Sequence, residues 1–420
     1  MKTNRISEIF KVLFGEIPGQ LVIQITNHCN GTCPQCGMRK TAAIERCRLP
    51  AKTIQAALRQ CPENGFEAVS FTGGEPFINM DELFSALDHA DETKIRYLRT
   101  GTNGFMLAPN GKSADIKQIT LFAQKLSATR VRNFWISIDS SDTKMHESMR
   151  GLPGVIEGIQ KALPVFHAHG LYPAANLGIN RNISGLSIDR LNGLDDEERF
   201  LKAFKSGFTA FFEKVIQMGF TIANVCYPMS SNNEEVAHPA YGAISADYII
   251  SFSSRELQLV FQALFEVVSV YRDKIRIFTP LSVLYAMADG DETLLFPCLG
   301  GIRYFYIDSR DGHIYPCGYR GNEDLGTDLK EAVRQATGSQ PNCMKCHWEC
   351  FRDPSQLFGI IRYMLRHPIQ TFFKNQIDPA IRKLWFEDIK YYIACDFFDG
   401  RTAPRRQKKS VSHTSKRNIL

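Results

Sequence analysis

The sequence has no apolar run that approaches the ~20 residues needed to span a bilayer. Its N-terminal stretch contains no continuous hydrophobic region of the kind found in secretory signals. Internal repeats, low-complexity tracts, a phosphate-binding P-loop and a GxGxxG motif after a predicted strand are also missing. These absences disfavour a membrane-spanning protein, an exported protein and the two common nucleotide-binding folds. We therefore expect a globular protein of the cytoplasm.

The excess of positive over negative charge is confined to one end of the chain. Seven of the 50 basic residues lie at residues 401–420, which contain no acidic residue, whereas the chain has 44 acidic residues in all. The net charge of +6 therefore comes from this tail, and the rest of the chain is nearly neutral. Such a tail is typical of a disordered, solvated segment. We expect no stable nucleic-acid partner, with a weak contact to nucleic acid or anionic lipid as the alternative.

Cysteine is abundant, with twelve residues, and without an export signal these are expected to be reduced. Cys29, Cys33 and Cys36 follow the apolar stretch at residues 21–25 with the spacing C-x3-C-x2-C. Three thiolates occur where a cubane iron–sulfur cluster normally takes four, so one iron would be open to bind a small molecule. A zinc site is the alternative, although zinc usually takes four ligands and no second cysteine pair lies nearby.

Short apolar runs alternate with longer stretches of helical period up to about residue 226. Strands are predicted at residues 20–26, 67–72, 95–100, 134–140, 174–182 and 220–226, and helices at 51–59, 80–90, 115–127, 155–169 and 195–218. This order predicts a parallel sheet with right-handed crossovers. Six units are too few for a closed eight-stranded barrel, so we expect an α/β fold with a partial (β/α)6 TIM-like barrel. Its chemistry would gather at the carboxyl ends of the strands.

A second motif, Thr72-Gly73-Gly74-Glu75-Pro76, ends the second predicted strand. The two glycines would let the backbone approach a ligand closely, and the glutamate supplies a carboxylate beside it. Together with the cysteine triplet, this motif resembles the radical S-adenosylmethionine (SAM) enzymes. The resemblance implies a [4Fe–4S] cluster on the three cysteines, with SAM bound at the open iron and its amino group held at the motif of residues 73–76.

Further polar residues match the resemblance by position. Asn103 lies in a Thr-Asn-Gly run after the third strand, Ser137 and Asp139 share one face of the fourth, and Asn180 lies on the fifth. The resemblance implies that these four residues contact SAM, and ordinary turn or strand polarity is the alternative. One departure is Gln35, which occupies a position where the family usually has an aromatic residue near adenine.

The C-terminal part contains a second cysteine pattern. A hairpin is predicted with strands at residues 302–307 and 313–316, and the cysteines around and after it are Cys298, Cys317, Cys343, Cys346 and Cys350. Their start, C-x13-G-x4-C, resembles the SPASM and twitch auxiliary-cluster domains. Five cysteines would serve one auxiliary [4Fe–4S] cluster with one thiolate to spare, unless Cys395 recruits a second cluster. A zinc site is again the alternative.

These patterns predict six regions along the chain. They are an N-terminal amphipathic helix (1–19), a radical SAM partial barrel (20–230), a helical connector (231–297), a SPASM/twitch-like auxiliary domain (298–353), C-terminal helices (354–400) and a basic disordered tail (401–420). The C-terminal helices are expected to pack on the barrel, with an interfacial position against lipid as the alternative.

The resemblance implies that the protein cleaves SAM reductively to a 5′-deoxyadenosyl radical, which removes hydrogen from a substrate. A peptide or protein is the expected substrate, with a small molecule or lipid precursor as the alternative, and a flavodoxin or ferredoxin is the expected electron donor. Cys226 is a candidate hydrogen donor, although a buried structural thiol is the simpler interpretation. A non-catalytic iron–sulfur electron-transfer protein is the alternative of another class. Only 28 residues precede Cys29, which disfavours an N-terminal cobalamin domain.

Overall fold

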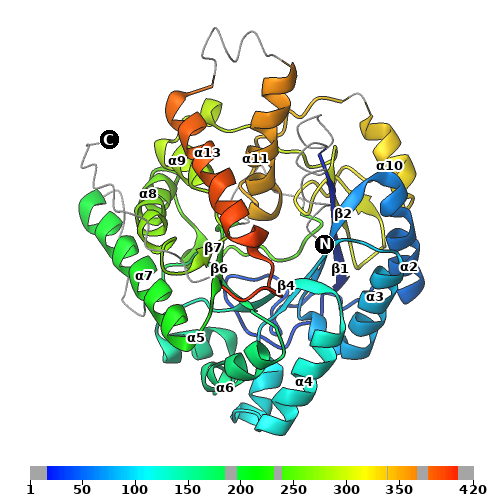
Figure 1. Ribbon diagram of the computed structural model, residues 1–420, viewed down its shortest axis with the longest axis vertical. Coiled ribbons are helices and arrows are strands. Elements are labelled where there is room, and N and C mark those ends of the chain that lie inside the picture. Colours follow the sequence, from blue (N-terminus) through cyan, green and yellow to red (C-terminus); the bar gives the residue numbers. More distant parts are fainter. Residues whose placement is uncertain (1–16, 185–195, 231–238, 338, 367–376, 405–420) are drawn as a thin grey trace.

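The computed structural model describes residues 17–184, 196–230, 239–337, 339–366 and 377–404. Most of the predicted N-terminal helix and the basic tail beyond residue 404 lie outside these ranges. In Figure 1 the helices of the first half of the chain follow the outside of a curved sheet, and three later helices, α9, α11 and α13, lie together beyond one end of it.

The described strands form one nine-stranded sheet with the order β7-β6-β5-β4-β3-β2-β1-β8-β9. The strands are β1 (Gly19–Thr26), β2 (Phe66–Gly73), β3 (Tyr97–Thr102), β4 (Val131–Ser137), β5 (Ala174–Gly178), β6 (Ile222–Cys226), β7 (Arg276–Ile277), β8 (Tyr304–Ile307) and β9 (Ile314–Tyr315). Every neighbouring pair is parallel except β8 and β9. The α/β class and the parallel, partial-barrel sheet are as predicted.

The side chains of β1 show how the sheet separates two environments. Leu21 and Ile23 join the large apolar core beneath the helices. Gln20 and Gln24 alternate with them and point to the other face, where Gln24 accepts a hydrogen bond from the hydroxyl of Tyr306 on β8. The inner face of the sheet is therefore partly polar, as expected for a barrel that binds a ligand in its interior.

Helices cover the outer face of the sheet. They are α2 (Ala51–Gln60), α3 (Met80–Glu92), α4 (Ile116–Ala128), α5 (Thr143–Arg150), α6 (Val155–Ala168), α7 (Glu197–Met218) and α8 (Ser254–Tyr271), followed by α9 (Leu281–Asp289), α10 (Leu329–Ala336), α11 (Glu349–Arg366) and α13 (Pro379–Ala394). Short 3₁₀ turns lie at Pro62–Asn64, Pro76–Asn79, Phe105–Leu107, Pro109–Gly111, Tyr248–Ile250, Glu292–Leu294 and Asp396–Phe398. Helix α7 buries Phe200, Phe204 and Phe208 completely, and this spacing of four residues places them on one face.

Two strand boundaries differ from the prediction for a local reason. The fifth strand ends at Gly178 and not at residue 182, because the Asn180 amide bonds the carbonyl oxygens of Gly178 and Asp139. The backbone of Arg181 then bonds Ile249 outside the sheet. The fourth strand likewise ends at Ser137, before Asp139. Both polar residues therefore lie in loops at the carboxyl edge of the sheet.

The predicted hairpin is present as β8 and β9, with Ile307 paired to Ile314. Its position in the sheet was not foreseen, because β8 also pairs in parallel with β1. The two-residue strand β7, in the region expected to be a helical connector, extends the opposite edge beside β6. Nothing in the local sequence specifies these pairings, which depend on tertiary packing.

The C-terminal helices pack against the connector, as Figure 1 shows for α9, α11 and α13. Buried Asp388 on α13 accepts hydrogen bonds from the first two N–H groups of α9, those of Leu281 and Ser282, and pairs with Arg272 at 2.8 Å. A carboxylate at a helix N-terminus satisfies donors that the helix cannot satisfy itself. Among the described residues, no helix has the length and apolar character required to cross a membrane.

Candidate functional site

The loop after β1 brings the first three cysteines together. A Cβ atom placed on Gly31 would lie 3.4 Å from the Cys33 sulfur and 3.6 Å from the Cys29 sulfur. The Gly31 N–H donates to the Cys29 sulfur at 3.4 Å, and the Cys36 N–H bonds the Cys33 carbonyl oxygen at 3.1 Å. Burial raises the pKa of Cys33 to about 12 and that of Cys36 to about 11. A bound cation would be needed to favour their thiolate forms.

The donor set fits a cubane cluster. Among the residues described, no three His, Cys, Asp or Glu side chains converge on a position for a single metal ion. A cubane does not require such convergence, because each cysteine binds a different iron. Three neighbouring thiols on one turn, with backbone N–H groups directed at sulfur, are the arrangement that such a cluster uses.

Several contacts fix the cysteine loop, and sequence reasoning did not identify them. The Arg46 guanidinium donates to the carbonyl oxygens of Asn27, Met38, Arg39 and Ala42. On the other side, a Cβ on Gly37 would lie 2.5 Å from the carbonyl oxygens of Gly242 and Ile244, in a segment more than 200 residues away. The loop is therefore held by the Arg46 side chain and by the backbone of residues 242–244, and is shaped before any cofactor binds.

The glycines of the second motif have a structural role that the sequence did not predict. A Cβ on Gly73 would lie 2.3 Å from the carbonyl oxygen of Thr26, and one on Gly74 would lie 2.0 Å from that of His28. Both distances are too short for any side chain. The close approach is thus to the backbone that leads into the cysteine loop, and it joins the ends of β1 and β2.

Glu75 is directed inward and is 1% exposed. Its Oε1 accepts from the Thr102 hydroxyl at 2.9 Å and from the Phe77 N–H at 3.1 Å, and its Oε2 accepts from the Asn103 N–H at 2.6 Å. Burial raises the pKa of Glu75 to about 7, against the lowering effect of these bonds. Pro76 begins the 3₁₀ turn that follows.

Asn103 connects this acidic position to the cysteine loop. Its backbone N–H binds Glu75, and its side-chain amide donates to Asn30 at 2.8 Å, between Cys29 and Gly31. The structure therefore brings the cysteine triplet, the motif at residues 73–76 and Asn103 to one edge of the sheet, as the sequence predicted.

Asp139 is the centre of a second buried group beside the cysteines. Its carboxylate pairs with Arg150 at 2.8 Å and accepts from the Gln35 amide at 2.9 Å. Its backbone N–H donates to His146 Nδ1 at 3.0 Å, and burial lowers the pKa of His146 to about 3, so this imidazole is neutral. Gln35, where the resemblance led us to expect an aromatic residue, thus joins the cysteine loop to Asp139.

Arg150 was not identified from the sequence. It ends α5, it is 8% exposed, and its Nε atom has no hydrogen-bond partner among the described residues. Its charge acts on the thiols of Cys29 and Cys33. Of the remaining predicted residues, Ser137 is in register with Asn176 of β5, and Asn180 uses its amide to fix the loop of Asp139.

Four of the five C-terminal cysteines form a second group. Cys298 and Cys343 pair as a backbone bridge, with the Cys298 N–H bonded to the Cys343 carbonyl oxygen at 2.8 Å. Cys298 and Cys343 both act electrostatically on Cys346, and Cys346 and Cys298 act on Cys317. Backbone N–H groups reach two of the sulfurs at 3.4 Å, from Gly300 to Cys298 and from Tyr319 to Cys317. This donor set of four thiols fits an iron–sulfur cluster.

The fifth cysteine, Cys350, has different neighbours. The strongest charges acting on it come from Glu349, Arg99 and Asp353. Its sulfur donates to Glu349 Oε1 at 3.5 Å, and Gln20 of β1 donates to its carbonyl oxygen at 3.1 Å. Cys350 therefore lies toward the interior of the barrel.

Cys226 lies at the carboxyl end of β6, where its sulfur and the Asn176 side-chain amide are 3.3 to 3.4 Å apart. Asn224, two residues earlier on the same face, donates to Asn176 at 2.8 Å. The interior of the barrel is thus lined by amides and thiols. The alternation of β5 and β6 places these residues on one face, which is the signal by which they could have been found.

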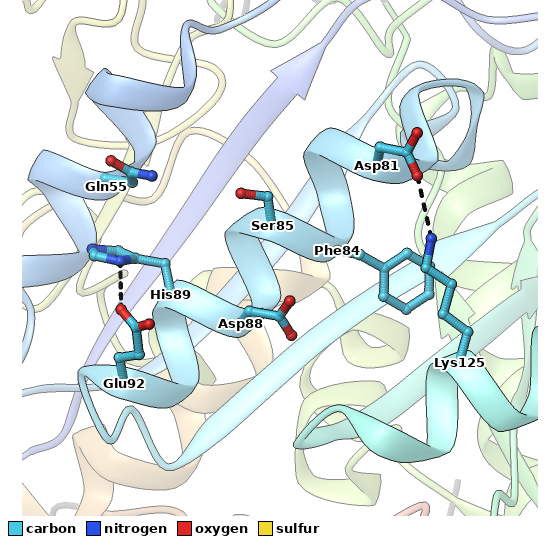
Figure 2. Close-up of a pocket in the computed structure, with 8 residues that line it drawn as sticks. All are labelled: Gln55, Asp81, Phe84, Ser85, Asp88, His89, Glu92 and Lys125. Atoms are coloured by element: carbon cyan, nitrogen blue, oxygen red, sulfur yellow. Dashed lines mark hydrogen bonds and ion pairs between the residues drawn. The ribbon is translucent and has the colours of Figure 1, made fainter.

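A surface pocket of about 390 Å³ lies on the outer side of the sheet. Figure 2 shows that it is formed largely by α3, with Lys125 of α4 paired to Asp81 and His89 bonded to Glu92. It contains no cysteine and is lined mainly by solvated charges. We assign it no part in the chemistry.

Comparison with known proteins agrees with this geometry. The Radical SAM superfamily profile matches residues 23–180. An AdoMet-dependent heme synthase from Methanosarcina barkeri is 21% identical over 72% of this chain and 77% of its own length. A GTP 3′,8-cyclase from Haemophilus influenzae is 27% identical over 49% of this chain and 59% of its own length.

Among solved structures, SuiB from Streptococcus suis bound to S-adenosylmethionine is similar, with 18% identity, a TM-score of 0.47, and coverage of 72% of this chain and 60% of that one. The profile match covers both the cysteine loop and the motif at residues 73–76. Members of this superfamily use a [4Fe–4S] cluster and SAM. Residues 23–180 of this chain, which contain both motifs, therefore form a Radical SAM domain.

Proposed function

We propose that this protein cleaves SAM reductively and uses the resulting radical to remove hydrogen from a substrate inside the barrel. The observation that carries the proposal is the convergence of Cys29, Cys33 and Cys36 with Glu75 at one edge of the sheet. A cluster on the three thiolates supplies one electron and an open iron for SAM. The chain's own residues bind, orient and enclose the cofactor.

The charges around the loop are suited to the two ends of the SAM methionine. Glu75 offers a carboxylate to the ammonium group, and among the described residues its Oε2 accepts one hydrogen bond, from the Asn103 N–H. Arg150 supplies a buried cation with an unused Nε on the side of the three thiols, which suits the carboxylate. Gly73, Gly74 and Pro76 fix the turn that presents Glu75. Ser137, Asp139 and Asn180 are the further residues proposed to contact SAM.

We further propose an auxiliary [4Fe–4S] cluster on Cys298, Cys317, Cys343 and Cys346. Anaerobically reconstituted protein should then contain about eight irons, four for each cubane. About four irons together with bound zinc would instead assign zinc to the C-terminal site.

For the substrate we propose a peptide or protein. The solved SuiB structures include one bound to its precursor peptide, and this SuiB chain is 16% identical over 86% of the present chain and 70% of its own length. A small-molecule or lipid-precursor substrate is the second candidate, and the polar amides inside the barrel would also suit it. A flavodoxin or ferredoxin in the cytoplasm would supply the electron.

The test is anaerobic incubation of the reconstituted protein with dithionite and SAM. Formation of 5′-deoxyadenosine and methionine is expected, and Cys33→Ser should abolish both. A protein that contains the cluster but yields neither product with any candidate peptide or small molecule would instead be a non-catalytic electron carrier.

A further inference from the structure

Two thiols and one carboxyl group meet inside the barrel, away from both cysteine groups described above. Glu349, the first residue of α11, accepts a hydrogen bond from Cys350 at 3.5 Å. Burial and, after it, the charge of Glu349 raise the pKa of the Cys226 thiol, so this thiol also lies near Glu349. These cysteines are 124 positions apart in the sequence and lie on different elements, β6 and α11. Only the tertiary fold therefore brings the two thiols close to Glu349.

The three groups line interior space. Each is partly accessible to solvent, yet burial raises the pKa of all three. Partial access combined with strong desolvation is expected for side chains that face an internal cavity. Cys226 is in register with Gly178, and a Cβ on Gly178 would lie 3.5 Å from Asp139 Oδ1. Cys226 therefore lies at the same level of the sheet as Asp139, one of the residues proposed to contact SAM.

A second observation indicates that a ligand enters this space. Arg99 of β3 is influenced by the charges of Glu349 and Cys350, and its Nε and Nη2 atoms are buried without a hydrogen-bond partner among the described residues. These two atoms form the edge of the guanidinium that binds a carboxylate or phosphate in two parallel bonds. Buried polar groups are normally satisfied, so this edge is expected to be completed by a bound molecule.

We propose that Cys226, Glu349 and Cys350 form a hydrogen-donating site for the substrate radical, and this inference rests on the radical chemistry proposed above. Cys226 gives its sulfur-bound hydrogen atom to the carbon radical, which forms a C–H bond and leaves a thiyl radical. The Cys350 thiol passes its proton to the Glu349 carboxylate and bonds to the thiyl sulfur, giving a disulfide radical anion. A cluster held by the four C-terminal cysteines would supply a one-electron acceptor for this anion, and a Cys226–Cys350 disulfide would then remain. Reduction of the disulfide by an external thiol resets the site.

The position of Cys350 connects the two regions. Cys346, in the four-cysteine group, precedes it by four residues, and α11 begins between them. The fifth cysteine is thus the partner of Cys226 and not a cluster ligand. This assignment predicts different iron contents for two variants. Cys350→Ser should retain about eight irons, whereas Cys346→Ser should lose about four.

The test uses reconstituted full-length protein with SAM in D₂O, with no added substrate and with dithionite limited to one electron per protein, so that an electron acceptor remains oxidised. Thiols exchange into S–D, so the 5′-deoxyadenosyl radical should take deuterium from the empty pocket. We expect most of the 5′-deoxyadenosine to carry one deuterium, and this fraction should fall severalfold in Cys226→Ala. A Cys226–Cys350 disulfide should appear by peptide mass spectrometry in the wild type and be absent from Cys350→Ser.

Cys61→Ala is the matched control. Cys61 is also a buried thiol, but it lies at the end of α2 on the outer side of the sheet, bonded to the Ala57 carbonyl oxygen. Its substitution should leave the deuterium fraction unchanged. Equal deuterium fractions in the wild type and Cys226→Ala, or loss of about four irons in Cys350→Ser, would overturn the inference. If the wild type forms no 5′-deoxyadenosine at all, the proposed function is contradicted as well. If the wild type forms 5′-deoxyadenosine but with the same deuterium fraction as Cys226→Ala, only the hydrogen-donor inference fails.

Discussion

The two cysteine groups of this protein are built in opposite ways. Cys29, Cys33 and Cys36 lie in one loop of eight residues, whereas the second group combines Cys298, before a hairpin, with Cys317 directly after it and the pair Cys343 and Cys346 further along the chain. The first group is local, so its spacing alone predicted its membership. The second is assembled by tertiary contacts, and its spacing left one of five cysteines unassigned.

The surroundings of the two groups differ as well. The barrel loop lies beside a carboxyl group, Glu75, and a cation, Arg150, which suit the two ends of an amino acid. The C-terminal group has four thiols and aromatic neighbours, with Trp348 packed against Tyr319 at 5.3 Å between ring centroids. A group with a free coordination position and charged neighbours is suited to binding and cleaving a molecule. A group with four thiols and an apolar wall is suited to accepting or passing electrons.

The largest effect is expected from a substitution in the barrel cysteine group. Cys33→Ser should abolish SAM cleavage and remove about half of the iron, because a two-cysteine site cannot retain a cubane. The iron of the C-terminal group should remain, as measured by iron analysis and electron paramagnetic resonance. Loss of all iron would show that the two groups depend on each other.

The corresponding change at the C-terminal group is Cys343→Ser. We expect it to lose about half of the iron while the reduced spectrum of the barrel cluster and its perturbation by SAM are retained. Iron analysis and spectra recorded with and without SAM check this. A variant that retains all its iron would exclude Cys343 as a ligand.

Glu75→Gln tests the charge that distinguishes the barrel group. The neutral amide should weaken SAM binding to the reconstituted protein by about tenfold or more, the loss expected for one buried charge-assisted bond. Because burial raises the pKa of Glu75 to about 7, the wild type should bind SAM more tightly as the pH rises through about 7.

The same raised pKa has the opposite consequence for stability without SAM. The protonated form is favoured in the fold, so the contribution of Glu75 to stability is fully present below its unfolded pKa and is lost as the pH rises through about 7. Glu75→Gln should remove both dependences, which calorimetry of SAM binding and chemical denaturation over this pH range would measure. A pH dependence retained by Glu75→Gln would assign it to another group.

The smallest expected effect compares one glycine beside each group. Gly74→Ala places a Cβ 2.0 Å from the backbone oxygen of His28, whereas Gly318→Ala places one 2.7 Å from the Tyr241 side chain. The atom met at Gly318 is the Tyr241 Cβ, which is held by its own backbone, so neither neighbour moves away easily and the shorter contact decides the order. Gly74→Ala should therefore destabilise the protein by about 3 kcal/mol and Gly318→Ala by about 1 kcal/mol. Urea denaturation measures both values, and the reverse order would contradict the rigid loop described here.

The sequence by itself determined the order of strands and helices, the parallel sheet, the hairpin and the two cysteine patterns. These features depend on local periodicity and on spacing within one loop or turn, which neighbouring residues specify. It also placed Glu75, Asn103 and Asp139 at the carboxyl edge, because parallel strands end on the same side.

Only the tertiary structure decided the pairing of β8 with β1, the ion pair between Arg150 and Asp139, and the meeting of Cys226 and Cys350 at Glu349. These contacts join elements distant in the sequence, and their register depends on how the sheet curves and which side chains fill its interior. Spacing along the chain carries no information about such distances, so the neighbours of each buried charge and thiol emerge only when the barrel has formed.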